Sequence, residues 1–135
     1  MSEDEGGRPH GAFGLRDFLG MDIEQGEAGT CAARLDAGDE HRNPHGTVHG
    51  AVLFTMVDTA MGGATMSVLD EGKLCASIDV HLRFLKPVFG GALEAAAEVV
   101  RAGKRVVHLE ARVRDGDGEV VAMATGAFAV LEAPA

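Results

Sequence analysis

Asp58 is the residue whose surroundings first suggest chemistry. It is the only charged residue between Gly50 and Leu69, and the nineteen residues after Gly50 read AVLFTMVDTAMGGATMSVL. A carboxylate is costly to bury among apolar side chains unless it is paired, hydrogen-bonded or protonated. A carboxylate that reaches solvent or caps a backbone group would be a purely structural alternative. The segment just upstream favours a functional role.

That upstream segment runs Asn43-Pro44-His45-Gly46-Thr47-Val48-His49-Gly50. Pro44 and Gly46 predict a loop, and a helix is expected to begin near His49 and Gly50. The first amides of a helix have no internal partner and carry the positive end of its dipole, so they can hold a carbonyl oxygen that becomes an oxyanion. The Gly50 amide is therefore a second candidate functional group.

The spacing of Gly50 and Asp58 constrains how they could act together. Eight residues of helix separate them by roughly 12 Å along the axis, at about 1.5 Å per residue. One chain cannot easily aim both groups at the same carbonyl, whereas two antiparallel helices across a dimer could. If both groups act, the site should therefore straddle a subunit interface.

At this point the sequence resembles a known family. Three motifs, Asn43-x5-His49-Gly50-x7-Asp58, Ala76-Ser77-Ile78-Asp79-Val80 and Phe84-Leu85-Lys86-Pro87, are similar to those of the PaaI-like hotdog thioesterases. Relatives in that family include phenylacetyl-CoA and 4-hydroxybenzoyl-CoA thioesterases. The resemblance covers about residues 40–131 and implies hydrolysis of an acyl-CoA, with CoA as part of the substrate and neither a separate cofactor nor a metal.

The resemblance also implies roles for five residues. The Gly50 N–H would polarise the thioester carbonyl, with Asn43 assisting and His49 orienting the loop. Asp58 of the facing subunit would act as general base on water or as a nucleophile. Ser77 would position the water or the carboxylate. The family pattern has a second glycine where this chain has Ala51, which could narrow the acyl pocket.

A CoA substrate brings three phosphates, which basic side chains would meet. Arg83 and Lys86 are one pair of candidates, and Lys104 and Arg105, together with Arg101, are another group near a predicted hairpin. The expected assembly is a homo-oligomer, a dimer at least, and tetramers are common in the resembled family. The acyl group is not readable from the sequence, so aryl and short- or medium-chain groups both remain open.

The elements that must position these residues follow from hydrophobic patterning. A short helix is expected at 12–19, an interrupted strand at 22–35 and a long helix from Gly50 to Leu69, buried nearly all round. Period-2 alternation and turn signals then predict four antiparallel strands, at 75–85, 92–101, 107–114 and 120–131. In the first of these, alternation places Ser77 on the polar face with Asp79. The fold class is α+β, an antiparallel sheet around one long helix, which the resemblance identifies as a hotdog fold.

Length, composition and charge set wider limits. The chain has 135 residues, which suits one domain at 12–135 after a disordered tail at 1–11. Its formal charge of −9 argues against a nucleic-acid partner. Asp58 and the lack of basic flanks argue against a membrane span. No export signal is recognisable and the two cysteines lie apart, which predicts a cytoplasmic protein with free thiols.

Three other functions are compatible with parts of the sequence. Asp39 and His45 lie in a segment like that of hotdog enoyl-CoA hydratases, but six residues apart instead of five, and that motif gives Asp58 no role. His41, His45 and His49 would converge on a metal only in a helix, which Pro44 and Gly46 oppose. A non-catalytic acyl-CoA-binding module would not need Asp58. Hydrolysis is therefore the favoured function.

Overall fold

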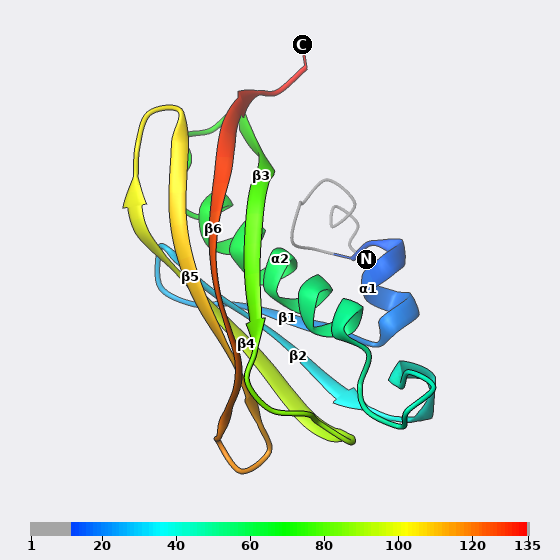
Figure 1. Ribbon diagram of the computed structural model, residues 1–135. Coiled ribbons are helices and arrows are strands. Elements are labelled where there is room, and N and C mark those ends of the chain that lie inside the picture. The colour runs from blue at the N-terminus through cyan, green and yellow to red at the C-terminus, as the bar shows by residue number, and fades with distance from the viewer. Residues whose placement is uncertain (1–11, 135) are drawn as a thin grey trace.

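A six-stranded antiparallel sheet curves around one long helix in the computed structural model, which describes residues 12–134 (Figure 1). The strand order is β1-β2-β4-β5-β6-β3. The prediction of a disordered tail at 1–11 lies outside the described residues. The elements, in chain order, are α1 (Gly14–Leu19), β1 (Asp22–Gln25), β2 (Thr30–Ala37), the short 3-10 helix η2 (Asp39–His41), α2 (Gly50–Met66), β3 (Lys73–Phe84), β4 (Gly91–Ala102), β5 (Val106–Asp115) and β6 (Val120–Glu132).

The core lies between the concave face of the sheet and one face of α2. Strand β5 shows the predicted alternation, because Val107, Leu109, Ala111 and Val113 are buried while His108 is exposed. Met56 and Met61 on α2 are fully buried against this face. The prediction of an α+β fold with an antiparallel sheet around one long helix is confirmed.

The prediction that α2 is buried nearly all round needs correction. The sheet covers one face of the helix, but the opposite face keeps solvent contact in the single chain: Phe54 is 41% exposed, and Asp58 and Gly62 are only partly buried. The sequence pattern could not distinguish the two faces because both are apolar, so the helix lacks the polar stripe that marks a solvent face.

Strand β3 lies at the edge of the sheet and carries a β-bulge. Ser77 pairs with Phe128 on β6, but the next paired residue is Asp79 with Ala127, so Ile78 has no partner. A bulge inserts one residue and reverses the alternation of side chains beyond it. Ser77 and Asp79 therefore lie on opposite faces, and the predicted shared face of these two residues is wrong. Ile78, predicted to be covered, is 56% exposed.

Two further expectations can be compared with the structure. Cys31 and Cys75 both carry free thiols, the first buried in the core and the second half-buried. Within residues 12–134, no helix combines the length and apolarity needed to cross a membrane.

Candidate active site

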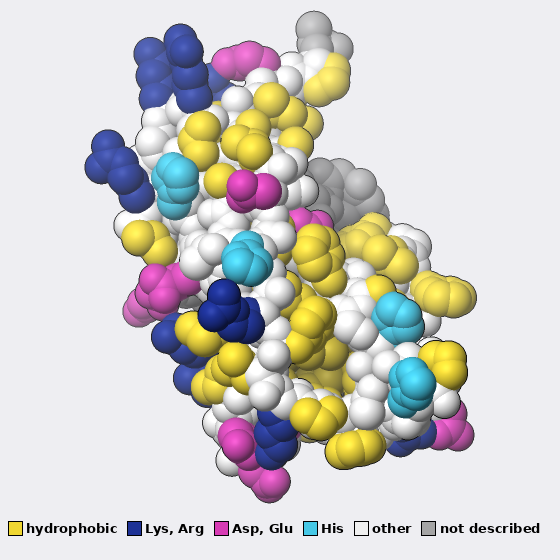
Figure 2. Space-filling view, in the orientation of Figure 1, with side chains coloured by type: hydrophobic (Ala, Val, Ile, Leu, Met, Phe, Trp, Pro, Cys, Tyr) yellow, Lys and Arg dark blue, Asp and Glu magenta, His cyan; other side chains and the backbone are white. Residues whose placement is uncertain are grey.

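Asp58 opens onto a cleft of about 590 Å³ between α2 and β3. The open face of α2 forms one wall, and Cys75 and Ser77 on β3 form the other. Phe128 lies at the back of the cleft, and Phe13 and Leu15, at the start of α1, also line it. In the space-filling view, hydrophobic side chains gather along the groove between β3 and α2 (Figure 2). The single carboxylate thus lies in a largely apolar cleft.

The Asp58 carboxylate is only partly satisfied. Its Oδ1 atom is buried and has no hydrogen-bond partner among the described residues. Burial raises the pKa of Asp58 because removal from water penalises the charged form, while hydrogen bonding by the nearby Ser77 hydroxyl acts in the opposite direction and is the weaker effect. A carboxylate that lines a cleft, with one buried oxygen lacking a hydrogen-bond partner and a raised pKa, is typical of a functional carboxylate.

The bulge at Ile78 is what brings Ser77 to this site. Ser77 shares the helix-facing side with Cys75 by ordinary alternation, and the reversal at Ile78 lets Val80 face that side as well. Regular alternation back from Val80 would instead point Ser77 away from the helix. The pKa of Cys75 is raised by burial and then by the charge of Asp58. The charge effect on Cys75 also identifies this thiol as a neighbour of the carboxylate.

Gly50 begins α2 and has a different pocket. His49 is the N-cap, and its Nδ1 atom accepts a hydrogen bond of 2.9 Å from the Ala51 amide. That bond occupies Ala51, whereas no hydrogen bond from the Gly50 amide is found within residues 12–134. The Gly50 pocket, of about 390 Å³, is lined by Phe84, Leu85 and Lys86 from the end of β3 and the turn after it. The free amide at this helix end is thus the Gly50 N–H.

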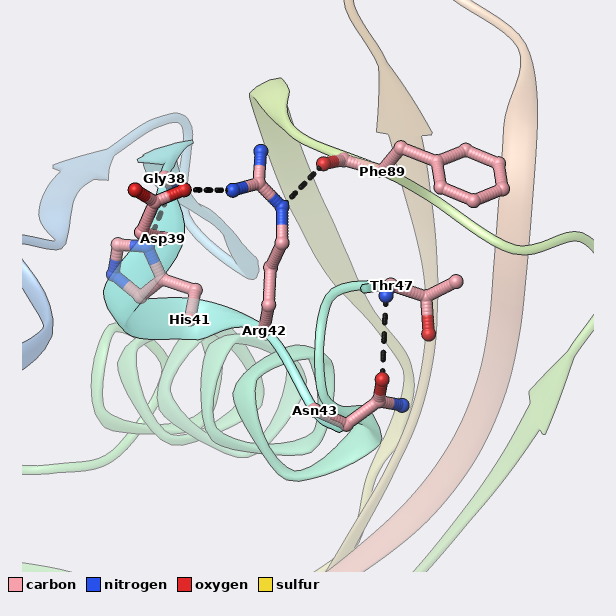
Figure 3. Close-up of polar contacts among 7 residues, drawn as sticks. All are labelled: Gly38, Asp39, His41, Arg42, Asn43, Thr47 and Phe89. Atoms are coloured by element: carbon pink, nitrogen blue, oxygen red, sulfur yellow. Dashed lines mark hydrogen bonds and ion pairs between the residues drawn. The ribbon is translucent and has the colours of Figure 1, made fainter. Parts of the chain in front are cut away.

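Asn43 shapes the loop that leads into α2 (Figure 3). Its Oδ1 atom accepts hydrogen bonds from the amides of His45, at 2.9 Å, and Thr47, at 3.2 Å. The backbone N–H of Asn43 also donates a hydrogen bond to the Thr47 carbonyl, at 2.8 Å. With Oδ1 engaged by the backbone, the group that Asn43 can offer a ligand is its Nδ2 donor.

The predicted separation of Gly50 and Asp58 agrees with this arrangement. The two residues lie on one helix, and each opens onto its own pocket. At about 1.5 Å per residue, the helix holds them roughly 12 Å apart along its axis. Within one chain, the free amide and the free carboxylate therefore do not face a common point.

The basic residues predicted to meet phosphates fall into two groups at opposite ends of β3. Lys104 and Arg105 lie in the β4–β5 hairpin, and the Arg105 carbonyl accepts a hydrogen bond from Val130 near the end of β6. Arg83 lies near the end of β3, and Lys86, in the turn after β3, lines the Gly50 pocket. Arg83 is exposed on β3 and lines a shallow depression of the outer sheet face.

Lys86 is already engaged with carboxylates. Its ammonium group lies 2.6 Å from Glu119 and 4.0 Å from Asp115. The hydrogen bond to Glu119, followed by the charges of these acids, raises its pKa. A phosphate would have to compete with both partners for Lys86.

The segment compared with a hydratase motif has a structural role in this chain (Figure 3). Asp39 forms an ion pair with Arg42, whose Nε atom donates to the Phe89 carbonyl at 2.8 Å. His41 is buried, its Nδ1 accepting from the Gly38 amide and its Nε2 lying 2.8 Å from the Leu19 carbonyl. Both ring nitrogens of the buried His41 thus contact backbone groups. Asp39, the carboxylate of the pair that a hydratase would need, forms an ion pair with Arg42, and its expected partner His45 is exposed.

Comparisons with known proteins agree with this geometry. The sequence profile of the family described as "Thioesterase superfamily" matches residues 45–122, more than half of the chain. This chain belongs to the thioesterase superfamily. The match begins in the loop before α2 and spans α2 with Asp58 and strands β3, β4 and β5. The chain is thus a hotdog-fold thioester hydrolase of the PaaI-like kind, as its motifs predicted.

Three relatives illustrate the likeness. A Bacillus halodurans protein, whose structure was solved with CoA, is 33% identical, with a TM-score of 0.79 over 87% of this chain and 75% of that one. The PaaI protein of the E. coli phenylacetic acid degradation operon is 26% identical, with a TM-score of 0.81 over 88% and 85% of the two chains. A 1,4-dihydroxy-2-naphthoyl-CoA hydrolase of Listeria monocytogenes is 20% identical over 118 residues, 87% of this chain and 96% of its own.

Sequence reasoning missed several residues that shape the two pockets. Phe84 was noted only as part of a motif, yet its ring packs against Gly50. Phe128 and Cys75 line the Asp58 cleft, although both read as ordinary core residues in their strands. The cross-strand pairing of β3 with β6 brings Phe128 to the site, and no local sequence signal predicts that pairing.

Proposed function

We propose that this protein hydrolyses the thioester bond of an acyl-CoA, with Asp58 as the reactive carboxylate. The unpaired Oδ1 atom of Asp58, in an apolar cleft beside Ser77, is the observation that carries the proposal. Water and the acyl-CoA give the free acid and the CoA thiol. The bound CoA of the 33%-identical relative supports the choice of CoA as the thiol part.

The site is completed by a second copy of the chain. Strand β3 pairs with β6 on one side, and no strand of the described chain pairs with its other side. An open edge of twelve residues is a template for antiparallel pairing with the same edge of a twofold-related copy. Such pairing would cover the exposed Ile78 and bring two antiparallel α2 helices together, so that Gly50 of one copy approaches Asp58 of the other.

Each residue then has a defined part in the reaction. The Gly50 amide, assisted by the Asn43 Nδ2 donor, holds the carbonyl oxygen as negative charge develops on it. His49 fixes the first turn of α2 through its bond to Ala51. Asp58 either removes a proton from the attacking water or attacks the carbonyl itself to form an anhydride that water then opens. Ser77 positions the carboxylate or that water, and the departing sulfur leaves as the CoA thiol.

Thiol release from a panel of acyl-CoA esters tests the activity. Phenylacetyl-, hydroxybenzoyl-, hexanoyl- and crotonyl-CoA serve as substrates, and the crotonyl absorbance is followed in parallel. Thiol release supports the proposal, whereas loss of the enoyl absorbance without thiol would indicate a hydratase. Binding of acyl-CoA without either change would indicate a binding module.

Hydrolysis in ¹⁸O-labelled water tests for the anhydride. Label found in the Asp58 carboxylate by mass spectrometry indicates an anhydride that water opens at the Asp58 carbonyl. Label confined to the acid product over repeated turnovers indicates that water attacks the acyl carbonyl, as a general base would direct it.

Mixing two inactive variants tests the shared site. Asp58→Asn keeps the Gly50 amide, and Gly50→Pro keeps Asp58 but lacks the N–H. In a mixed dimer, one of the two sites combines the intact Gly50 amide with the intact Asp58, and the other site lacks both. Because random pairing of equal amounts makes about half of the dimers mixed, about one quarter of the wild-type activity should return. No recovery after subunit exchange would mean that both groups act within one chain.

A further inference from the structure

Gly62 lies one helical turn beyond Asp58, on the same open face of α2. A β-carbon placed on Gly62 would meet only Cε2 of Phe128, at 3.8 Å, an ordinary van der Waals contact. The backbone of Gly62 is helical and does not require a positive φ. The fold would therefore accept alanine, which is also the better helix former.

Gly63, the next residue, is different. A β-carbon there would lie 2.5 Å from Sγ and 3.2 Å from Cβ of Cys31 on β2. Gly63 is thus needed for the close packing of α2 on the sheet. No comparable contact requires a glycine at position 62. The absence of a side chain at Gly62 therefore has a cause other than packing of α2 on the sheet.

That space belongs to the cleft at Asp58. The cleft continues past the carboxylate between Gly62 and Met66 on the helix and Cys75 on β3, with the Phe128 ring behind them. The Cys75 thiol lies 3.9 Å from the Gly62 carbonyl, which marks how closely β3 approaches here. Asp58 is the one charged residue among the described residues that line the cleft. An apolar group extending from a thioester at Asp58 would pass over Gly62.

We propose that Gly62 is a specificity-determining residue, whose missing side chain makes room for an uncharged, apolar acyl group of aryl or medium-chain size. This inference rests on the proposed thioesterase function. Acyl groups that carry a free carboxylate, such as succinyl, are excluded, because the cleft offers them no cation and the Asp58 charge repels them. Gly62→Val would fill the space with two methyl groups beside Phe128.

The test compares kcat/KM of wild type, Gly62→Ala, Gly62→Val and Gly63→Ala for acetyl-, butyryl-, hexanoyl-, octanoyl-, phenylacetyl- and succinyl-CoA. Each methylene that can no longer be buried costs roughly fourfold in kcat/KM. Gly62→Val is therefore expected to lose about tenfold or more on octanoyl- and phenylacetyl-CoA and to keep acetyl-CoA turnover within about threefold. Gly62→Ala should show a smaller change in the same direction and an unchanged or higher Tm.

Gly63→Ala is the control, because the Gly63 backbone also lines the cleft but its β-carbon would point at Cys31 in the core, and it should lower Tm without discrimination by acyl size. An unchanged acyl profile in Gly62→Val, or an equal loss on every substrate, would overturn the inference and leave the thioesterase intact. Wild-type succinyl-CoA turnover equal to that of butyryl-CoA would overturn the charge exclusion.

Binding decides the same point without turnover. The affinities of octanoyl- and acetyl-CoA are measured by calorimetry in Asp58→Asn with and without Gly62→Val. The inference is supported if the double variant binds octanoyl-CoA more weakly than Asp58→Asn does, while the two proteins bind acetyl-CoA equally. Equal affinity of the two proteins for octanoyl-CoA overturns it. Absence of thiol release from every ester by wild type would refute the proposed function separately.

Discussion

The ring of Phe84 fills the space that a β-carbon on Gly50 would need, with Cζ only 2.9 Å from that position. Gly50→Ala should therefore displace the ring, since Phe84 is 55% exposed and can move, and lower kcat/KM several-fold with the N–H retained. Gly50→Pro places a similar β-carbon but removes the N–H, and the His49 conformation, φ −62° and ψ 137°, is suited to precede proline. Its kcat/KM should fall by about a hundredfold or more.

The comparison of these two Gly50 variants isolates the amide. Thermal unfolding checks that both are folded, and thiol release gives the rates. Equal activity of Gly50→Pro and Gly50→Ala would remove the oxyanion role from Gly50.

Ser77→Ala tests the group placed by the β-bulge. The Ser77 hydroxyl lowers the pKa of Asp58 against the larger effect of burial, so its removal should raise that pKa further. Because hydrolysis needs the carboxylate form, the acid limb of the kcat/KM profile should move to higher pH. Thr125→Ala, on the outer face of the neighbouring strand β6, is the control and should leave the limb in place. An unmoved limb in Ser77→Ala would separate Ser77 from the Asp58 carboxylate.

Two substitutions separate the two functions of Asn43, which are to hold the loop through Oδ1 and to offer the Nδ2 donor to the substrate. Asn43→Asp keeps an oxygen for the amides of His45 and Thr47, so the loop should stay folded while the Nδ2 donor is lost. Asn43→Ala loses both, and should also lower the stability by about 1–2 kcal/mol. We expect both variants to lose activity, but only Asn43→Ala to melt at a lower temperature. Full activity of Asn43→Asp would limit Asn43 to shaping the loop.

Asp58→Asn should stabilise the fold at neutral pH. Burial raises the pKa of Asp58 above its unfolded value, so the carboxyl group favours folding below the unfolded pKa, and that contribution is lost as pH rises through the folded pKa. The neutral amide avoids this loss. The gain is expected to be about 1 kcal/mol at pH 7, or a few degrees in Tm, and to shrink towards about pH 4. A Tm difference independent of pH would show that burial of the charge carries no cost.

Much of the fold could be predicted because periodicity reports burial directly. Strand β5 alternates without interruption, and the long apolar segment before β3 forms α2 as expected. The helix pitch alone predicted that Gly50 and Asp58 do not face one point, and their separate pockets agree with it.

The remaining features depend on contacts between distant segments. One unpaired residue, Ile78, decides which side of β3 carries Ser77, and the alternation of Cys75 to Phe84 does not reveal it. The two adjacent glycines, Gly62 and Gly63, look alike in the sequence, yet only Gly63 is confined by Cys31. The sequence likewise does not show that Lys86 is held by Glu119.

Thiol release by Asp58→Asn tests the central claim most directly. Wild type, Asp58→Asn and the control Asp70→Asn, whose carboxylate is exposed beyond α2, are compared on one acyl-CoA that wild type hydrolyses. The account predicts a loss of about a thousandfold or more in kcat for Asp58→Asn, with the fold retained and acyl-CoA still bound, and wild-type rates for Asp70→Asn. A folded Asp58→Asn that hydrolyses the thioester at the wild-type rate would contradict it.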